Sequence, residues 1–155
     1  MVEISNYNDT YKVQTISLLL SVLEDELGYV GYERPDIHDI PDVYQKDDLG
    51  NFWLAIDGDQ VVGTIALQNY GKNRAMIKRM SVKKEYRRKG IGQRLLTELI
   101  TFAKKSNLET VYLTTMNEFE AARNLYEKNG FQVIDELPED MAMPDEDIYM
   151  KLKVS

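Results

Sequence analysis

The feature that most constrains this chain is a basic segment with two closely spaced glycines, placed between a strand pattern and a helix pattern. Residues 75–82 have the pattern of a strand, and residues 91–105 carry apolar side chains at three- and four-residue spacing, as an amphipathic helix does. Gly90 and Gly92 stand at the start of that helix. Unpaired backbone N–H groups at a helix N-terminus, flanked by basic side chains, bind anions. The sequence therefore predicts a binding site for a phosphate or pyrophosphate at this point of the chain, which we call the anion seat.

Two other kinds of phosphate-binding loop do not fit this segment. A P-loop places Gly-Lys-Ser/Thr at the helix start, where this chain has Gly92-Gln93-Arg94. A dinucleotide-binding fingerprint has a third glycine at the position that Leu95 occupies. The pattern that remains is a short loop rich in arginine and lysine with two glycines, formed by Arg87, Arg88, Lys89, Gly90, Ile91 and Gly92.

Acidic residues outnumber basic ones, 26 against 19, and give the chain a formal net charge of −7. Domains that bind nucleic acid usually present a strongly basic face, so this balance argues against nucleic acid as a general partner. A cationic substrate attracted to an acidic surface is compatible with it. The basic residues between 78 and 89 leave a nucleic-acid contact as an alternative, which predicts binding that weakens steeply with salt.

The chain contains no cysteine and a single histidine, His38. Thiolate nucleophiles, disulfides and cysteine-based metal sites are therefore excluded, and a histidine-ligated metal site is not expected. No apolar run reaches the roughly 20 residues of a membrane span, and residues 1–6 lack the basic start and apolar run of a signal peptide. We expect a cytoplasmic protein that binds neither a metal nor a membrane.

The order of expected elements indicates an α/β fold. Asp57-Gly58 between two apolar runs is a strong hairpin signal. Residues 28–50 are irregular and rich in tyrosine, which fits either a packed loop or a mobile lid, and residues 138–147 are expected to form an acidic loop. The whole implies a single domain over residues 1–155, with one mixed sheet and helices on both faces. Strands are expected at residues 2–7, 52–56, 60–67, 75–82, 110–115, 131–134 and 148–154, and helices at residues 9–27, 36–44, 91–105 and 118–128.

The residues around the two glycines resemble the pyrophosphate-binding motif of the GNAT superfamily of CoA-dependent N-acetyltransferases. The resemblance covers residues 52–131 well and the two ends in outline. It implies a mixed, mostly antiparallel sheet of about seven strands, acetyl-CoA as co-substrate and an amine acceptor. The acceptor can be a small molecule or a peptide. Because dimers are common in that superfamily, the resemblance is also compatible with a homodimer. The resemblance rests on Ile77–Val82, Tyr86–Gly92, Ala122, Leu125–Lys128, Gly130-Phe131 and the hairpin of residues 52–67.

The resemblance also implies roles for individual residues. In that superfamily the strand ending at Val82 separates from the next parallel strand, and the pantetheine arm enters the gap as an added strand would. A bulge near Ser81 would turn an N–H toward the thioester carbonyl and stabilise the oxyanion of the tetrahedral intermediate. Asn117 is a candidate for a cofactor-contacting asparagine, although Phe119 occupies the usual position. Cofactor binding is thus assigned to Met80, Ser81, Val82, Arg87, Arg88, Lys89, Gly90, Ile91, Gly92 and Asn117.

Tyr126 is the candidate general acid. CoA leaves as a thiolate, and a thiol like that of cysteine has a pKa of about 8.5, while a phenol has one near 10. A tyrosine is therefore a protonated donor at neutral pH if its hydroxyl reaches the sulfur. The alternative is that Tyr126 only fills the core beside Phe131.

The general base stays open. Some relatives use a glutamate on the strand beside the cofactor, but residues 110–115 offer only Thr114 and Thr115 there. A water chain or the carboxylate of Glu24, Glu26 or Asp36 would have to deprotonate the acceptor amine. The leading interpretation is an N-acetyltransferase that works by direct attack. The alternative is a non-catalytic sensor that binds acyl-CoA on the same fold, and turnover distinguishes the two.

Overall fold

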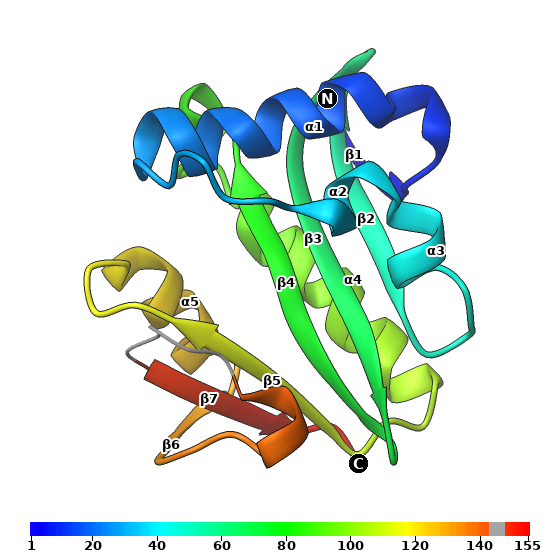
Figure 1. The fold of residues 1–155 in the computed structure, drawn as a ribbon, viewed down its shortest axis with the longest axis vertical. Coiled ribbons are helices and arrows are strands. Elements are labelled where there is room, and N and C mark those ends of the chain that lie inside the picture. The colour runs from blue at the N-terminus through cyan, green and yellow to red at the C-terminus, as the bar shows by residue number, and fades with distance from the viewer. Residues whose placement is uncertain (143–147) are drawn as a thin grey trace.

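A single sheet, in the order β1-β2-β3-β4-β5-β7-β6, runs through the structure (Figure 1). The computed structural model describes residues 1–142 and 148–155. All neighbouring strands are antiparallel except β4 and β5, which are parallel. This confirms the mixed, mostly antiparallel sheet expected from the sequence. The strands are β1 (Val2–Asn6), β2 (Asn51–Asp57), β3 (Gln60–Gly71), β4 (Arg74–Val82), β5 (Thr110–Thr115), β6 (Gln132–Ile134) and β7 (Ile148–Lys153).

Helices cover both faces of the sheet, as predicted. The first helix and the short helices after it lie on one face, and α4 lies on the other (Figure 1). The expected helix over residues 36–44 is divided into two short ones. The loop expected at residues 138–147 contains one 3₁₀ turn, and its residues 143–147 lie outside the described part. The helices are η1 (Asp9–Tyr11), α1 (Lys12–Leu20), the π-helical η2 (Ser21–Glu26), α2 (Pro35–His38), α3 (Ile40–Tyr44), η3 (Lys84–Tyr86), α4 (Ile91–Lys105), α5 (Glu120–Lys128) and η4 (Glu139–Met141).

Strand β2 shows why the sheet needs helices on both sides. Phe52 and Leu54 belong to the core that includes residues of α1, α2 and α3, whereas Trp53 belongs to the core under α4 and α5. Successive strand residues point to opposite faces, so a strand that is apolar at almost every position must be covered twice. Trp53 meets Phe102 of α4 edge to face, with ring centroids 5.2 Å apart. None of the helices in the two described ranges combines the length and apolar character that a membrane span requires.

Gly50 joins the α3 segment to β2 at a point where no side chain fits. A Cβ atom there would lie 2.7 Å from the Tyr44 carbonyl oxygen and 2.9 Å from that of Leu67, both of them main-chain atoms. We expect Gly50→Ala to lower the free energy of unfolding by about 2 kcal/mol, because the backbone has to move to relieve the overlap. Urea denaturation of the two proteins measures this difference.

Gly28→Ala is the matched control. Gly28 has a φ of 75°, but a Cβ atom there would meet nothing within 4 Å. This substitution should therefore cost only the left-handed conformation, about 1 kcal/mol. Equal losses of stability at Gly28 and Gly50 would contradict the argument from overlap.

Candidate active site

The two parallel strands of the sheet are paired at one end only. Three residue pairs join β4 to β5, from Arg74↔Thr110 to Met76↔Tyr112. Beyond these pairs the strands diverge, so the second half of β4 and the end of β5 lie apart (Figure 1). Over the described residues, the β5-facing edge of β4 therefore lacks a paired strand from Ile77 to Val82. An extended ligand can bind such an edge as an added strand would.

A β-bulge interrupts β4 in this unpaired half. Thr64 of β3 pairs with Ser81 and Ala66 pairs with Lys78, so β4 has one residue more than β3 between the same two pairs. Arg79 adopts the left-handed conformation, with a φ of 53°. That conformation costs a non-glycine residue roughly 1–2 kcal/mol, so other contacts must hold it. The bulge expected near Ser81 is present, and its centre lies at Arg79.

The hydroxyl of Thr64 holds the backbone carbonyl of Arg79, the residue at the centre of the bulge. It donates to the Arg79 carbonyl oxygen at 2.6 Å and accepts from the Ser81 hydroxyl at 2.6 Å. A trans peptide unit directs its C=O and N–H in opposite directions, so the Met80 N–H points away from Thr64 and β3. The Ser81 side chain is buried and engaged with Thr64. The Ser81 hydroxyl is therefore not available to a ligand.

Hydrogen bonding at the end of β4 shows that the main-chain groups of Val82, like the Met80 N–H, point away from β3. The Lys83 N–H donates to the Val62 carbonyl at 2.7 Å, toward β3. Main-chain groups of successive residues in an antiparallel pair alternate between the two edges, so those of Val82 point toward the separated β5. The Nε of Arg87 donates to the Val82 carbonyl at 2.9 Å. Met80 and Val82 are thus the two residues of this strand end whose backbone faces the opening.

A largely buried ion pair holds the side chain of Arg79. Arg79 donates from Nε and Nη2 to the two carboxylate oxygens of Asp36, at 2.8 and 2.7 Å. The Tyr44 hydroxyl donates to the same carboxylate at 2.7 Å. Burial alone would raise the pKa of Asp36, but the hydrogen bonds from Arg79 and Tyr44 and the charge of Arg79 outweigh it and leave the pKa below its usual value of 3.8. Asp36 therefore stays ionised with both oxygens occupied, which makes it a poor general base.

The other two candidate bases are also paired with arginines. Glu24 receives a hydrogen bond from Nη1 of Arg34 at 3.2 Å, and Glu26 lies 2.7 Å from Nη1 of Arg87. Each of these carboxylates thus has at least one oxygen engaged by a guanidinium group. The geometry thus favours none of the three carboxylates as the base, and a water chain is the route that remains from the sequence analysis.

The glycine loop has the features of an anion seat. Gly90 caps α4 in a left-handed conformation, with a φ of 80°, and no side chain caps the helix start. A Cβ atom at Gly90 would meet nothing within 4 Å, so there is open space beside this residue at the helix start. Arg88 and Lys89 are exposed beside it, and Ile91 is buried and can contribute only its backbone. An uncapped helix start with exposed cations suits a phosphate group.

Arg87, assigned to the same seat, points elsewhere. Its guanidinium bonds Glu26 and the Val82 carbonyl, on the strand side of the loop. In this arrangement Arg87 links η2 to the end of β4. Arg88 and Lys89 are the remaining exposed cations of the loop, and the Lys89 ammonium lies 5.5 Å from the centroid of the Tyr86 ring.

The three sequence motifs meet at one point. A Cβ atom at Gly92 would lie 3.1 Å from the Met80 methyl group and 3.5 Å from a methyl group of Leu125. The start of α4, the bulged end of β4 and α5 are therefore in contact. The side chains of Gln93 and Asn129 exchange two hydrogen bonds, of 2.9 and 2.8 Å, and tie α4 to α5. The absence of a side chain at Gly92 allows this close approach.

Tyr126 lies in α5, next to Leu125. Its ring is 5% exposed and meets Phe131 edge to face at 5.7 Å. Burial raises the pKa of Tyr126 above its usual value, so the phenol stays protonated across the neutral range. No residue in the described ranges accepts a hydrogen bond from its hydroxyl. Asn117 is exposed in the turn before α5, and its carbonyl accepts from Arg123 at 3.5 Å.

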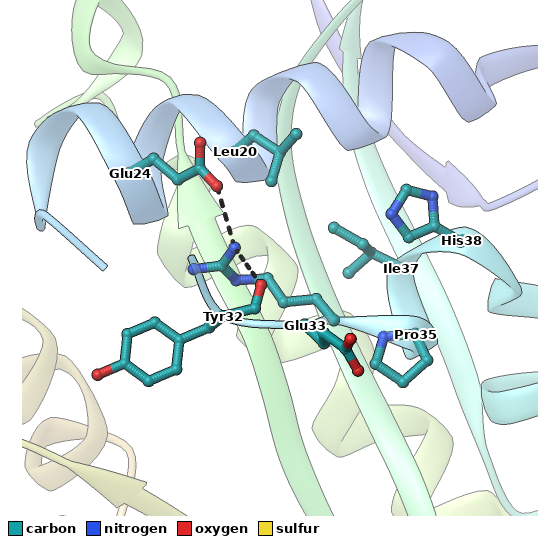
Figure 2. Close-up of a pocket in the computed structure, with 8 residues that line it drawn as sticks. Leu20, Glu24, Tyr32, Glu33, Pro35, Ile37 and His38 are labelled. Carbon is teal, nitrogen blue, oxygen red and sulfur yellow. Dashed lines mark hydrogen bonds and ion pairs between the residues drawn. The ribbon is translucent and has the colours of Figure 1, made fainter. Parts of the chain in front are cut away.

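A cavity of about 410 Å³ lies between α1–η2 and the segment of residues 32–38. Figure 2 shows Leu20 and Glu24 reaching into it from the helix, with Tyr32 to His38 on the other side. The Arg34 guanidinium sits between them, bonded to Glu24 and to the carbonyls of Tyr29 and Tyr32. Asp36, between the lining residues Pro35 and Ile37, reaches the β4 bulge through Arg79. The cavity and the bulge thus share one segment of chain.

Sequence reasoning assigned no individual role to Thr64, Tyr44 or Arg79, although each lies in a segment that it singled out. The one local signal is that Lys78-Arg79 places two charged residues in succession in the middle of a largely apolar strand. Within the described residues, no cluster of three or more histidine, aspartate or glutamate side chains could hold a metal ion.

Comparison with known sequences identifies similar proteins. The family model "Acetyltransferase (GNAT) family" matches residues 18–131. The chain is 38% identical over 102 residues to a probable N-acetyltransferase camello of Xenopus tropicalis, which covers 64% of this chain and 46% of that protein. It is 38% identical over 110 residues to the N-acetylaspartate synthetase of Danio rerio, covering 70% of this chain and 39% of that protein. The chain therefore spans less than half the length of these curated relatives.

Solved structures resemble the whole chain. A GNAT-family acetyltransferase from Staphylococcus aureus Mu50 superposes with a TM-score of 0.91 at 32% identity, and the match covers 100% of both chains. A PaiA N-acetyltransferase from Thermoplasma acidophilum, solved with coenzyme A, has a TM-score of 0.77 at 21% identity over 99% of both chains, which shows the shared fold.

Proposed function

The chain belongs to the GNAT family of acetyltransferases, and from this premise we propose that it transfers the acetyl group of acetyl-CoA to a primary amine by direct attack. One observation carries the proposal. The anion seat at Gly90, the unpaired edge of β4 and the α5 segment with Tyr126 converge, and Gly92 lies against both Met80 and Leu125. A cofactor with a phosphate end and an extended arm fits this arrangement.

The residues present suit acetyl-CoA as co-substrate. The open space at Gly90 and the uncapped start of α4 would take the pyrophosphate, with Arg88 and Lys89 as counter-charges. The main-chain groups of Met80 and Val82 would bond the pantetheine arm as a neighbouring strand does. Coenzyme A is also present in the solved PaiA structure that shares this fold.

The chemistry needs a donor for the oxyanion and a proton for the leaving group. When the amine nitrogen attacks the thioester carbonyl, negative charge develops on its oxygen, and the Met80 N–H is directed to the side where it could stabilise that charge. When the carbon–sulfur bond breaks, the thiolate takes a proton from the Tyr126 hydroxyl. The ammonium proton of the acceptor leaves through water, because the nearby carboxylates are paired with arginines.

A turnover assay tests the proposed function against a sensor that only binds. Acetyl-CoA is mixed with a panel of polyamines, amino acids, aminoglycosides and N-terminal peptides, and release of free thiol is followed. Thiol release that depends on one class of amine supports the enzyme. Tight binding of acetyl-CoA without turnover on any amine would favour the sensor instead.

The acceptor we propose is a small amine that is cationic before it reacts. Two carboxylates line the cavity beside the bulge: Glu24, which is paired with Arg34, and Glu33, which is exposed. We expect Glu33→Gln to raise KM for such an amine roughly fivefold and to leave kcat little changed, because an exposed charge contributes mainly to ground-state attraction. Initial rates at varied amine concentration measure this.

Glu98→Gln serves as the control. Glu98 is exposed on α4, on the opposite face of the sheet, and its loss changes the net charge equally. If both variants raise KM alike, the cavity is not the acceptor site.

A further inference from the structure

A continuous set of hydrogen bonds connects the bulge of β4 to the segment of residues 32–38, which lines the cavity and which we call the acceptor segment. Tyr44 of α3, Asp36 of α2 and Arg79 of β4 form this set, which we call the clamp. The side chains of Asp36 and Arg79 are only 19% and 22% exposed, and Tyr44 is 2% exposed. The clamp spans 43 positions of sequence between Asp36 and Arg79. Its partners are therefore brought together by the tertiary fold.

We propose that the clamp positions the catalytic backbone of β4, so that Asp36 and Tyr44 are positioning residues for acetyl transfer. The proposal rests on the proposed function, since it assigns to the bulge the task of orienting the Met80 N–H. Neither Asp36 nor Tyr44 needs to touch the substrate for this task.

The left-handed backbone of Arg79 is the point on which the clamp acts. This conformation is unfavourable for arginine, and it persists because Thr64 holds the carbonyl and Asp36 holds the side chain. If Arg79 relaxed toward an ordinary strand conformation, the peptide unit that carries the Met80 N–H would rotate. A donor misplaced by about 1 Å can lower a rate on the order of a hundredfold, so a small rotation matters.

The clamp also fixes the acceptor segment relative to the thioester. Pro35 and Ile37 line the cavity, and Asp36 between them is bonded to the bulge. One ion pair thus sets both the orientation of the proposed oxyanion donor and the distance to the acceptor. Loss of the clamp should therefore lower kcat and affect acetyl-CoA affinity little, because the clamp acts on the Met80 N–H, whereas the anion seat and the main-chain groups of Val82 lie outside it.

The test compares Asp36→Asn and Tyr44→Phe with the control Asp140→Asn. Asp140 pairs with Arg74 at 2.6 Å, so it forms an ion pair with an arginine of the same strand, at the end remote from the bulge. We expect kcat to fall about tenfold or more in the two clamp variants, with the calorimetric Kd for acetyl-CoA within about twofold of wild type. The double variant should lose less than the product of the single losses, because both substitutions weaken one guanidinium contact.

Two spectroscopic readouts separate positioning from a general loss of stability. The carbonyl ¹³C shift of bound, acetyl-labelled acetyl-CoA reports the hydrogen bond to its oxygen, and it should move toward the free value in the clamp variants. Amide exchange of residues 79–82 in the free protein should be faster in Asp36→Asn than in Asp140→Asn. An unchanged kcat or carbonyl shift in both folded clamp variants would overturn the clamp.

The outcomes also distinguish the clamp from the proposed function. A wild-type protein that binds acetyl-CoA but transfers no acetyl group contradicts the proposed enzymatic function. The carbonyl ¹³C shift of bound acetyl-CoA then tests whether the clamp orients the Met80 N–H. If wild type binds no acetyl-CoA, the proposed function fails, and exchange rates at residues 79–82 that are equal in Asp36→Asn and Asp140→Asn overturn the clamp as well.

Discussion

Replacing Gly90 by glutamate is expected to lower the affinity for acetyl-CoA at least about a hundredfold. Gly90 stands at the uncapped start of α4, and a side chain there would extend into open space next to the first N–H groups of the helix. A carboxylate placed there competes for those N–H groups and repels a pyrophosphate. The left-handed φ of 80° adds a strain of about 1 kcal/mol for any side chain, which a folded domain tolerates. Calorimetry with acetyl-CoA measures the affinity, and thermal unfolding checks the fold.

Three companion substitutions separate the effect of the charge from that of the strain. Gly90→Ala carries the same left-handed strain without a carboxylate, so it should lose affinity only a few-fold. Lys104→Glu reverses a charge at the far end of α4 and should change affinity little. Arg88→Glu should lower the affinity for acetyl-CoA as much as Gly90→Glu does. Unchanged affinity in both Gly90→Glu and Arg88→Glu would show that the phosphate seat is misassigned, and salt-dependent binding of random DNA would then favour the nucleic-acid alternative.

The sequence predicted most of the fold because the relevant signals are local. The hairpin at Asp57-Gly58 joins β2 and β3 as expected, and the apolar spacing over residues 91–105 coincides with α4. The sheet and its helices on both faces followed from the order of these elements. The helix expected over residues 9–27 is present, but it begins as the 3₁₀ turn η1 and its last third is the π-helical η2, which ends shortly before Gly28. No residue pattern marks a π turn, so periodicity could not locate it.

The candidate site was predictable only in its continuous parts. The glycine loop and the strand before it are neighbours in sequence, and their motif indicated a phosphate seat. The pairing of Asp36 with Arg79 and of Glu26 with Arg87 depends on the tertiary fold, across 43 and 61 positions. For that reason three carboxylates could be named as candidate bases from the sequence, whereas the structure shows each of them beside an arginine.

Replacing Tyr126 by phenylalanine is expected to lower kcat about a hundredfold or more while acetyl-CoA still binds. General acid catalysis typically contributes 10²–10⁴-fold, and the departing thiolate is the group that needs the proton. Phenylalanine keeps the ring that packs against Phe131 at 5.7 Å. The hydroxyl has no acceptor among the described residues, so its removal should leave the free energy of unfolding nearly unchanged. Single-turnover rates and calorimetry separate the chemical step from binding.

Tyr112→Phe is the matched control, because it removes a hydroxyl from β5 at the paired end of β4 and β5. Its kcat should stay within about twofold of wild type. A wild-type rate in Tyr126→Phe would return Tyr126 to the role of a core residue beside Phe131. Loss of acetyl-CoA binding in Tyr126→Phe would instead show that the hydroxyl acts in the ground state.

The pH dependence of kcat gives a separate test of the same role. Burial raises the pKa of Tyr126 above its usual value of 10.0, so the phenol remains protonated through the neutral range. An anion is destabilised by the same dry surroundings whether it is a phenolate or a thiolate, so burial also makes the departing thiolate a stronger base. The wild-type rate should therefore rise with pH as the acceptor amine loses its proton, with no fall near neutrality caused by Tyr126. A fall in kcat between pH 7 and 9 that disappears in Tyr126→Phe would contradict a permanently protonated donor.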